Sequence, residues 1–509
     1  MNKKSRLENS LRNTAVGVAS QILNMIFGLA VRTVFIRCLS AEYLGVNGLF
    51  SNILTMLSLA EMGIGTAIVF NMYKPLVEGD ELHIAKLMNL YRNAYIIIGI
   101  VIAVIGSCLT PFLGSIIRNQ PDIPHLRLIY LLYLINTVSS YFFAYRRSIF
   151  TADQRERVIK ECNMITVMIR SFLQIAILII WKNFIAYLLV QIVCTFCENV
   201  LISLYADFCY PFLKKYRYEQ LDKVEKHSIF ENIKATFVYK FGSVVLNGTD
   251  NIIISAVNGV TSVGLLSNYT LLTGSVEAFL NVVNHSITGS VGNYIVKENS
   301  DSHERLLINT SFINFLLYGM VFVGSIAVLN PFVEWWAGKN YLLSTAIIIV
   351  HCFNIYISGT ISSVWTFRST MGLFKYGKWR PLFSAIINVV VSIWWGNKIG
   401  LIGVLIGTTF TRVVTNLWYD PWIVYKYGLN KSPKGYYLRW IIYFLVICLN
   451  TIGILYIQHS SSIHGIIAVI FYGSLSVVLF CSSVFLIFHN CNEFRYTFSM
   501  LKKVLNRKL

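Results

Sequence analysis

The chain has 509 residues, of which 55% are hydrophobic and 13% charged, and its formal net charge is +19. Apolar stretches of about 20 residues recur with short interruptions, as the roughly 30 Å hydrocarbon core of a bilayer requires. The cations are spread over many short segments and do not form one stripe interleaved with aromatic residues, which argues against a nucleic-acid-binding protein.

The hydropathy pattern predicts an all-α integral membrane protein with about fourteen transmembrane helices. The first apolar stretch is too long for a signal-peptide core, so it is expected to remain attached as the first helix. In chain order, the predicted spans are 12–36, 46–70, 93–117, 126–145, 162–181, 184–206, 233–257, 262–292, 310–330, 344–367, 381–396, 400–420, 440–457 and 465–489.

Lysine and arginine fall unevenly on the two sides of these spans. With the N-terminus inside, 33 of the 43 lie in cytoplasmic segments and only five lie on the opposite side. Positive residues are retained on the cytoplasmic side of bacterial membranes. The sequence therefore predicts a multi-pass protein of the bacterial cytoplasmic (inner) membrane with both termini cytoplasmic. The cytoplasmic cations are also expected to contact anionic membrane lipid.

The loops are too short to build a catalytic domain. The longest cytoplasmic loop, 207–232, has 26 residues, and the sequence has no phosphate-binding P-loop. A glycan polymerase or glycosyltransferase would carry a large external loop with catalytic acids, whereas only Glu42, Asp122 and Glu334 are expected outside. The pair Cys194 and Cys197 lacks further ligands nearby, so we predict no metal, no cofactor and no enzymatic activity.

Eight charged residues fall inside the predicted spans and more than three residues from either end. Each costs roughly 2.5–3.5 kcal/mol at the centre of a lipid-facing helix, so these residues are expected to face one another, water or a polar substrate. The bases are Arg32, Arg170, Lys240 and Arg412, and the acids are Glu61, Glu198, Asp250 and Glu277.

The charges lie on polar helical stripes that predict a large hydrophilic cavity. The four bases are candidates to bind a phosphate or pyrophosphate, and the amides of Asn24, Asn247, Asn281 and Asn284 are candidates to bind sugar hydroxyls. The four acids are candidates to carry a coupling ion, with Asp250 and Glu277 favoured. His285 is expected to be a hydrogen-bonded core residue. The alternative that all these groups pair between helices and only fix the packing stays open.

A weak internal repeat divides the chain. Gly45 and Gly264 begin similar segments, and the charged positions around them nearly superimpose. We therefore expect an N-terminal lobe at 1–206, a cytoplasmic linker at 207–232, a C-terminal lobe at 233–420, and two further helices with a basic tail at 421–509. Parallel repeats that enclose a site near the membrane midplane are typical of transporters.

Two segments carry a family resemblance. Residues 39–54 (LSAEYLGVNGLFSNIL) and 57–70 (LSLAEMGIGTAIVF) resemble the polysaccharide transporter family of the MOP superfamily. The resemblance implies a MATE-like fold and, most closely, a Wzx-type flippase that moves undecaprenyl-pyrophosphate-linked oligosaccharides outward for capsule or O-antigen lipopolysaccharide. It also implies polysaccharide polymerase or assembly proteins as partners, and it transfers no catalytic residue.

Two other transporter functions remain as alternatives within the same fold. They are a MATE-like cation-coupled small-molecule exporter and a lipid II flippase. The four intramembrane bases favour an anionic substrate over the exporter's cations. The sequence leaves open whether transport is coupled to protons, to sodium or only to the substrate gradient.

Overall fold

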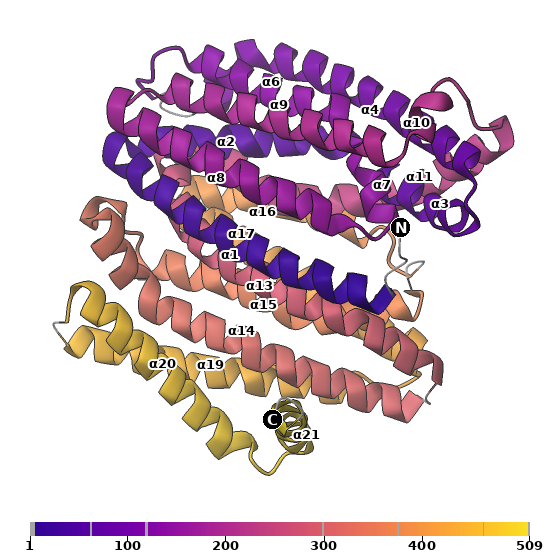
Figure 1. Ribbon diagram of the computed structural model, residues 1–509. Helices are drawn as coiled ribbons and strands as arrows, with labels where there is room; N and C mark the ends of the chain where they lie inside the picture. Colours follow the sequence, from indigo (N-terminus) through magenta and orange to yellow (C-terminus); the bar gives the residue numbers. More distant parts are fainter. Residues whose placement is uncertain are drawn as a thin grey trace. The chain divides into compact units, whose positions relative to one another are not determined.

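The computed structural model describes residues 6–61, 64–117, 121–297, 300–373, 376–461 and 463–506. These residues form helices joined by short turns, with no β-strand among them (Figure 1). The α-helices are α1 (Arg6–Cys38), α2 (Ala41–Leu57), α3 (Ile64–Glu78), α4 (Glu81–Leu109), α5 (Leu113–Ile116), α6 (Leu126–Ala144), α7 (Arg147–Ala152), α8 (Glu156–Trp181), α9 (Phe184–Cys209), α10 (Phe212–Lys215), α11 (Lys223–Gly248), α12 (Asp250–Asn258), α13 (Val260–Lys297), α14 (Ser300–Ala337), α15 (Thr345–Thr370), α16 (Arg380–Ile399), α17 (Leu401–Arg412), α18 (Tyr419–Ile423), α19 (Lys434–Ser460), α20 (Gly465–Phe488) and α21 (Asn492–Asn506). Short 3-10 helices are η1 (Ser58–Glu61), η2 (Thr110–Phe112) and η3 (Lys339–Tyr341), and π-helices are η5 (Val413–Leu417) and η6 (Val424–Leu429).

The all-α membrane architecture is confirmed. Among the described residues, eleven helical segments are long and apolar enough to cross a membrane, and each corresponds to a predicted span. The other three predicted spans correspond to α2 with α3, to α11 with α12, and to α13, so a total of fourteen is compatible with the helices.

The exposed faces of these helices are apolar. In α20 the mean hydropathy reaches 2.2 while only 22% of the segment is buried, and Ile467 and Leu486 are 67% and 71% exposed. A soluble protein rarely exposes such a surface to water, whereas lipid tails cover it at no cost. The chain is therefore a multi-pass membrane protein.

The chain divides into two compact units, Met1–Gly264 and Leu265–Leu509. In the first unit, α1 packs against α8, α8 against α9, and α6 against both α4 and α9. In the second unit, α14 packs against α15, α19 and α20, and α16 packs against α17. Since α11 and α12 pack against α2, they fall in the first unit, and the unit boundary lies beyond the linker predicted at 207–232. The lobe boundaries drawn from the repeat stay a prediction.

Three of the predicted spans are interrupted helices. The span 46–70 is broken by η1 between α2 and α3, with residues 62–63 outside the described part, and the span 233–257 is broken between α11 and α12. The span 400–420 continues to Leu429 through two π-helical segments. Interrupted helices free backbone groups from the regular hydrogen-bond ladder, and in transporters such interruptions form binding sites.

Gly45 and Gly264 lie where α2 and the start of α13 approach closely. A Cβ atom on Gly45 would overlap the carbonyl oxygen of Val260, and a Cβ atom on Gly264 would overlap that of Ala41. Each residue of the second segment lies 219 positions after its counterpart in the first. The two close approaches therefore join positions at the same sequence offset, and the internal repeat stays a prediction.

We expect Gly264→Ala to destabilise the protein by about 1–3 kcal/mol, because the added methyl group overpacks the approach to α2. The matched control is Gly28→Ala in α1, where an added Cβ atom meets no described heavy atom within 4 Å. Both substitutions raise helix propensity by about 1 kcal/mol, so only the first should lower the thermal unfolding midpoint in detergent. Equal midpoints for the two variants would contradict the close approach.

Candidate functional site

Two of the predicted substrate-binding arginines meet at one tyrosine in the first unit. Arg32 of α1 and Arg170 of α8 both lie within electrostatic range of the hydroxyl group of Tyr187 in α9. The Phe35 ring packs 5.5 Å from the Tyr187 ring and fixes α1 against α9. The side chain of Gln174 donates a 3.5 Å hydrogen bond to the backbone oxygen of Tyr187 and fixes α8 against α9. The geometry brings Arg32 and Arg170 near the same tyrosine, and their role in binding a substrate stays a prediction.

Tyrosine and asparagine side chains lie among the neighbours of this arginine pair. Tyr133 is a further electrostatic neighbour of Arg32 and donates a hydrogen bond to the side-chain oxygen of Asn47. Asn24 lies two helical turns before Arg32 on the same face of α1. Among the described residues, no carboxylate lies within ion-pair distance of Arg170. A guanidinium group without a carboxylate nearby, on a membrane-spanning helix, attracts an anion strongly, because the low dielectric of the membrane interior screens charge poorly.

Three tyrosine side chains lie around Glu61 at the break between α2 and α3. Tyr95 donates a hydrogen bond to its carboxylate, and Tyr91 donates a 2.8 Å hydrogen bond to Tyr95. Tyr141 interacts with the same carboxylate, and its ring lies 5.5 Å from that of Tyr95. Within the described part of the chain, no cation pairs with Glu61. A carboxylate held only by hydroxyl groups inside a membrane can bind a proton or a metal cation, so its candidacy as a coupling residue stays a prediction.

Glu198 has a different environment from Glu61. It is buried on α9 and forms a 2.8 Å ion pair with Arg147, which also donates a 2.9 Å hydrogen bond to Asn199. A buried carboxylate with a fixed cationic partner is already neutralised, so this geometry favours a structural role.

The structure describes the side chains of only some of the remaining polar candidates, which lie on α11, α12 and α13. Asp250 occupies the first turn of α12, where the helix dipole stabilises a carboxylate. Asn281 is exposed on α13. The side chains of Lys240, Asn247 and His285 lie outside the described part of the chain.

In the second unit, Arg412 lies beside an acid. Arg412 donates a 2.5 Å hydrogen bond to the backbone oxygen of Asn354 and lies within electrostatic range of Glu277 and His351. His351 is held by a 3.0 Å hydrogen bond to the hydroxyl group of Thr273, one helical turn before Glu277. This cluster contains both charge signs, whereas the arginine pair of the first unit is cationic.

The Glu277 side of this cluster contains a further predicted residue. Asn284 donates a 3.0 Å hydrogen bond to the hydroxyl group of Tyr318, and Tyr318 is an electrostatic neighbour of Glu277. The structure therefore groups Glu277, Asn284 and Arg412, and the roles of these residues stay predictions. His351, Thr273 and Tyr318 were not among the predicted site residues. The polar spacing of His351 and Asn354 on one face of span 344–367 is the signal that could have found α15.

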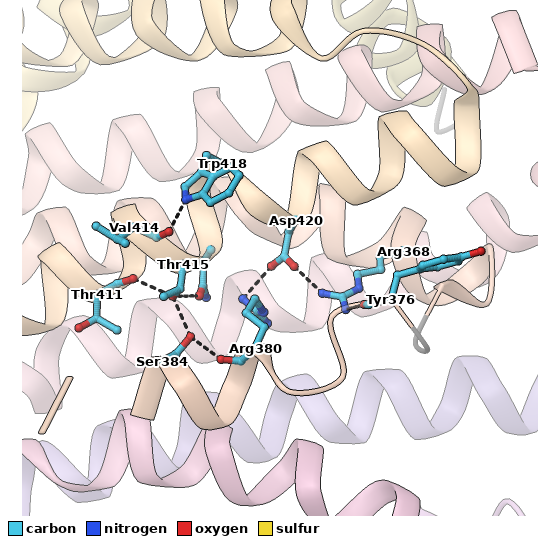
Figure 2. Close-up of polar contacts among 10 residues, drawn as sticks. Arg368, Tyr376, Arg380, Ser384, Thr411, Val414, Thr415, Trp418 and Asp420 are labelled. Carbon is cyan, nitrogen blue, oxygen red and sulfur yellow. Dashed lines mark hydrogen bonds and ion pairs between the residues drawn. The ribbon is translucent and has the colours of Figure 1, made fainter. Parts of the chain in front are cut away.

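A buried ion cluster in the second unit corrects one sequence interpretation. Arg368 and Arg380 were counted as cytoplasmic loop cations, and Asp420 was not among the intramembrane acids. Arg368 and Asp420 are each 1% exposed and form an ion pair, and Arg380 lies 2.9 Å from the second oxygen of Asp420 (Figure 2). Arg368 also donates a 2.5 Å hydrogen bond to the backbone oxygen of Tyr376. Asp420 lies in α18, and the helical segment continues past it through η6 to Leu429, so the acid is not at the end of the span.

Comparisons with known proteins agree with this architecture. The family model described as "Polysaccharide biosynthesis protein" matches residues 10–291. The solved structure of the lipid II flippase MurJ in an inward closed conformation is 15% identical, with a TM-score of 0.63 over 94% of this chain and 99% of that chain. An inward-facing multidrug resistance MATE family transporter of the MOP superfamily is 15% identical, with a TM-score of 0.57 over 82% of this chain and 99% of that one. No curated protein sequence gives a match. The MATE-like fold is therefore confirmed.

Proposed function

Because the chain belongs to the polysaccharide biosynthesis protein family of MOP-superfamily transporters, we propose that it is a flippase for lipid-linked oligosaccharides. Its substrate would be an undecaprenyl-pyrophosphate-linked repeat unit for capsule or O-antigen, moved across the cytoplasmic membrane by alternating access. The single observation that carries this proposal is the meeting of Arg32 and Arg170 at Tyr187 within membrane-spanning helices.

The chemistry of this pair suits a pyrophosphate. Each guanidinium group offers a planar fork of N–H donors that binds two phosphate oxygens at once. The desolvation of the Arg170 guanidinium group is offset when the substrate brings the opposite charge into the same low-dielectric region. Asn47 accepts a hydrogen bond from Tyr133, and Asn24 lies two helical turns before Arg32 on α1; both offer neutral amides where sugar hydroxyls could be bound. A protein with this role binds and moves its substrate and performs no covalent chemistry.

The function is tested with the purified full-length protein in proteoliposomes. A radiolabelled undecaprenyl-pyrophosphate oligosaccharide is placed in one leaflet, and its appearance in the other is followed with membrane-impermeant periodate. We expect faster translocation than in protein-free liposomes. Parallel assays use lipid II and an organic cation, because transport of the cation without the oligosaccharide would favour a MATE-like exporter and overturn the proposal. Transport of lipid II without transport of the undecaprenyl-pyrophosphate oligosaccharide would indicate that the protein is a lipid II flippase.

We propose that Glu277 with Arg412 couples transport to an ion gradient. A substrate anion that approaches Arg412 would weaken the attraction between Arg412 and Glu277, so the carboxylate could then bind a proton or sodium. Glu277→Gln is expected to abolish the dependence of translocation on an imposed proton or sodium gradient, while downhill translocation continues. The matched control is Glu334→Gln on α14. Unchanged gradient dependence in Glu277→Gln would exclude the residue from coupling.

The proposed direction of export requires both termini in the cytoplasm of the bacterium. The uneven distribution of lysine and arginine supports this orientation. Cysteine-accessibility mapping in intact cells should find a cysteine introduced at exposed Tyr218, in the loop 207–232, protected from impermeant reagents. Labelling of Tyr218→Cys from outside would contradict the orientation. A polysaccharide polymerase or assembly protein on the outer side is the partner expected to receive the product.

A further inference from the structure

A basic cavity lies at one end of the first unit, away from the arginine pair at Tyr187. Its volume is about 290 Å³, and it is lined by α4, by the turn between α6 and α7, by the end of α9, and by α10 with the turn that follows it. Of these elements, α4 packs against both α6 and α10 (Figure 1). The proposed transport function assigns no role to this cavity.

The lining carries four cations and one carboxylate. The cations are Arg92, Arg146, Lys214 and Arg217, and the acid is Asp207. Asp207 forms an ion pair with Arg146 and lies 3.5 Å from the ammonium group of Lys214, so its charge is already neutralised. Among the described residues, no carboxylate lies within ion-pair distance of Arg92 or Arg217. The cavity therefore has an excess of positive charge.

Hydrogen bonds fix the cavity walls before any ligand binds. The side chain of Asn89 on α4 donates hydrogen bonds to the backbone oxygens of Tyr216 at 2.8 Å and Glu219 at 2.9 Å, which holds the segment after α10 against α4. Arg146 donates a 2.9 Å hydrogen bond to the hydroxyl group of Tyr145. A preformed site binds with a smaller loss of conformational entropy than a site that must be ordered by its ligand.

We propose that this cavity binds a phosphate group, with Arg92 and Arg217 as its main ligands. Basic pockets between transmembrane helices on the cytoplasmic side are suited to anionic lipid headgroups, and the charge pattern predicts that this end of the first unit is cytoplasmic. The volume equals that of about ten water molecules, which accommodates a glycerol phosphodiester but not an oligosaccharide. The phosphate could belong to a phospholipid headgroup or to a free phosphate ion.

The test measures lipid binding and not transport, so it is independent of the proposed function. The full-length protein is placed in phosphatidylcholine nanodiscs, and binding of a fluorescent phosphatidylglycerol is titrated. We expect one saturable site in the unaltered protein. In the double variant Arg92→Gln with Arg217→Gln, the affinity should fall about tenfold or more, since each cation near an anionic headgroup contributes roughly 1 kcal/mol.

The control has the same change in charge at exposed positions outside the cavity, Lys223→Gln with Lys434→Gln. It should bind phosphatidylglycerol as the unaltered protein does, and Arg92→Lys with Arg217→Lys should recover most of the affinity. Competition by millimolar inorganic phosphate would show that the site accepts the free ion, and its absence would assign the site to the lipid headgroup. Absence of a saturable site in the unaltered protein, or equal loss in the control, would overturn the proposal.

Discussion

Arg170→Ala is expected to reduce translocation of a pyrophosphate-linked oligosaccharide about 100-fold, while the protein still inserts into the membrane. Hydrogen bonds to a charged group contribute about 1.5–3 kcal/mol, and a loss near the upper end of that range corresponds to about two orders of magnitude. Arg170→Lys should restore only part of the activity, because an ammonium group cannot bind two phosphate oxygens in the planar fork geometry. The measurement is the initial translocation rate in proteoliposomes, normalised to the amount of inserted protein.

The matched control for this prediction is Arg127→Ala, which removes an arginine from an exposed position at the start of α6 in the same unit. Its translocation rate should equal that of the unaltered protein. Arg32→Ala should behave like Arg170→Ala, since both guanidinium groups lie near Tyr187. Normal translocation by both Arg32→Ala and Arg170→Ala would remove the pair from the mechanism.

Much of the fold could be predicted because a bilayer imposes strong constraints on length and polarity. The positions of apolar stretches determine where helices lie, and each of the eleven apolar helical segments in the described residues coincides with a predicted span. The sequence also singled out Gly45 and Gly264, and both lie where two helices approach too closely for a side chain. Such a requirement leaves a direct mark in the sequence.

Helix interruptions could not be predicted from the same signals. The break at Ser58–Glu61 lies in an apolar stretch that contains no proline. A hydropathy average over this stretch therefore does not detect it. Its position depends on tertiary contacts such as the hydrogen bond from Tyr95 to Glu61. Periodicity places residues on a face of a helix, but it does not identify the partner that this face meets.

Some of the buried charged residues could be recognised from the local sequence, whereas others are identified only by their tertiary contacts. Arg32 and Arg170 stand out because each is an isolated cation inside an apolar span. Arg368 and Arg380 lie in a short segment with four cations, which resembles an ordinary cytoplasmic loop. Asp420 is distant from both arginines in the sequence. Only the fold shows that it forms ion pairs with both of them in a buried cluster. His351 and Asn354 share one face of the span 344–367, but two polar residues without a charge are a weaker pattern than the stripes that contain Arg32 or Glu277.

Asp420→Asn is expected to lower the free energy of unfolding by about 3–5 kcal/mol, because it leaves the buried Arg368 without its countercharge. Arg368 and Asp420 are each 1% exposed, so water cannot replace the lost partner. A loss of this size is a large fraction of the 5–15 kcal/mol that stabilises a typical folded protein. The thermal unfolding midpoint and the yield of monodisperse protein in detergent should both fall.

Two further variants separate the loss of the countercharge from other effects of the substitution. Asp301→Asn removes an aspartate that is 76% exposed and ion-paired with Lys431, and exposed pairs contribute at most about 1 kcal/mol. The triple variant Arg368→Met, Arg380→Met and Asp420→Leu should recover most of the stability, since an apolar cluster of similar volume often replaces a buried ion cluster without loss. If Asp420→Asn is no less stable than Asp301→Asn, the cluster does not hold the segment between α15 and α16 in place. If the triple variant is as unstable as Asp420→Asn, the instability arises from packing and not from unpaired charge.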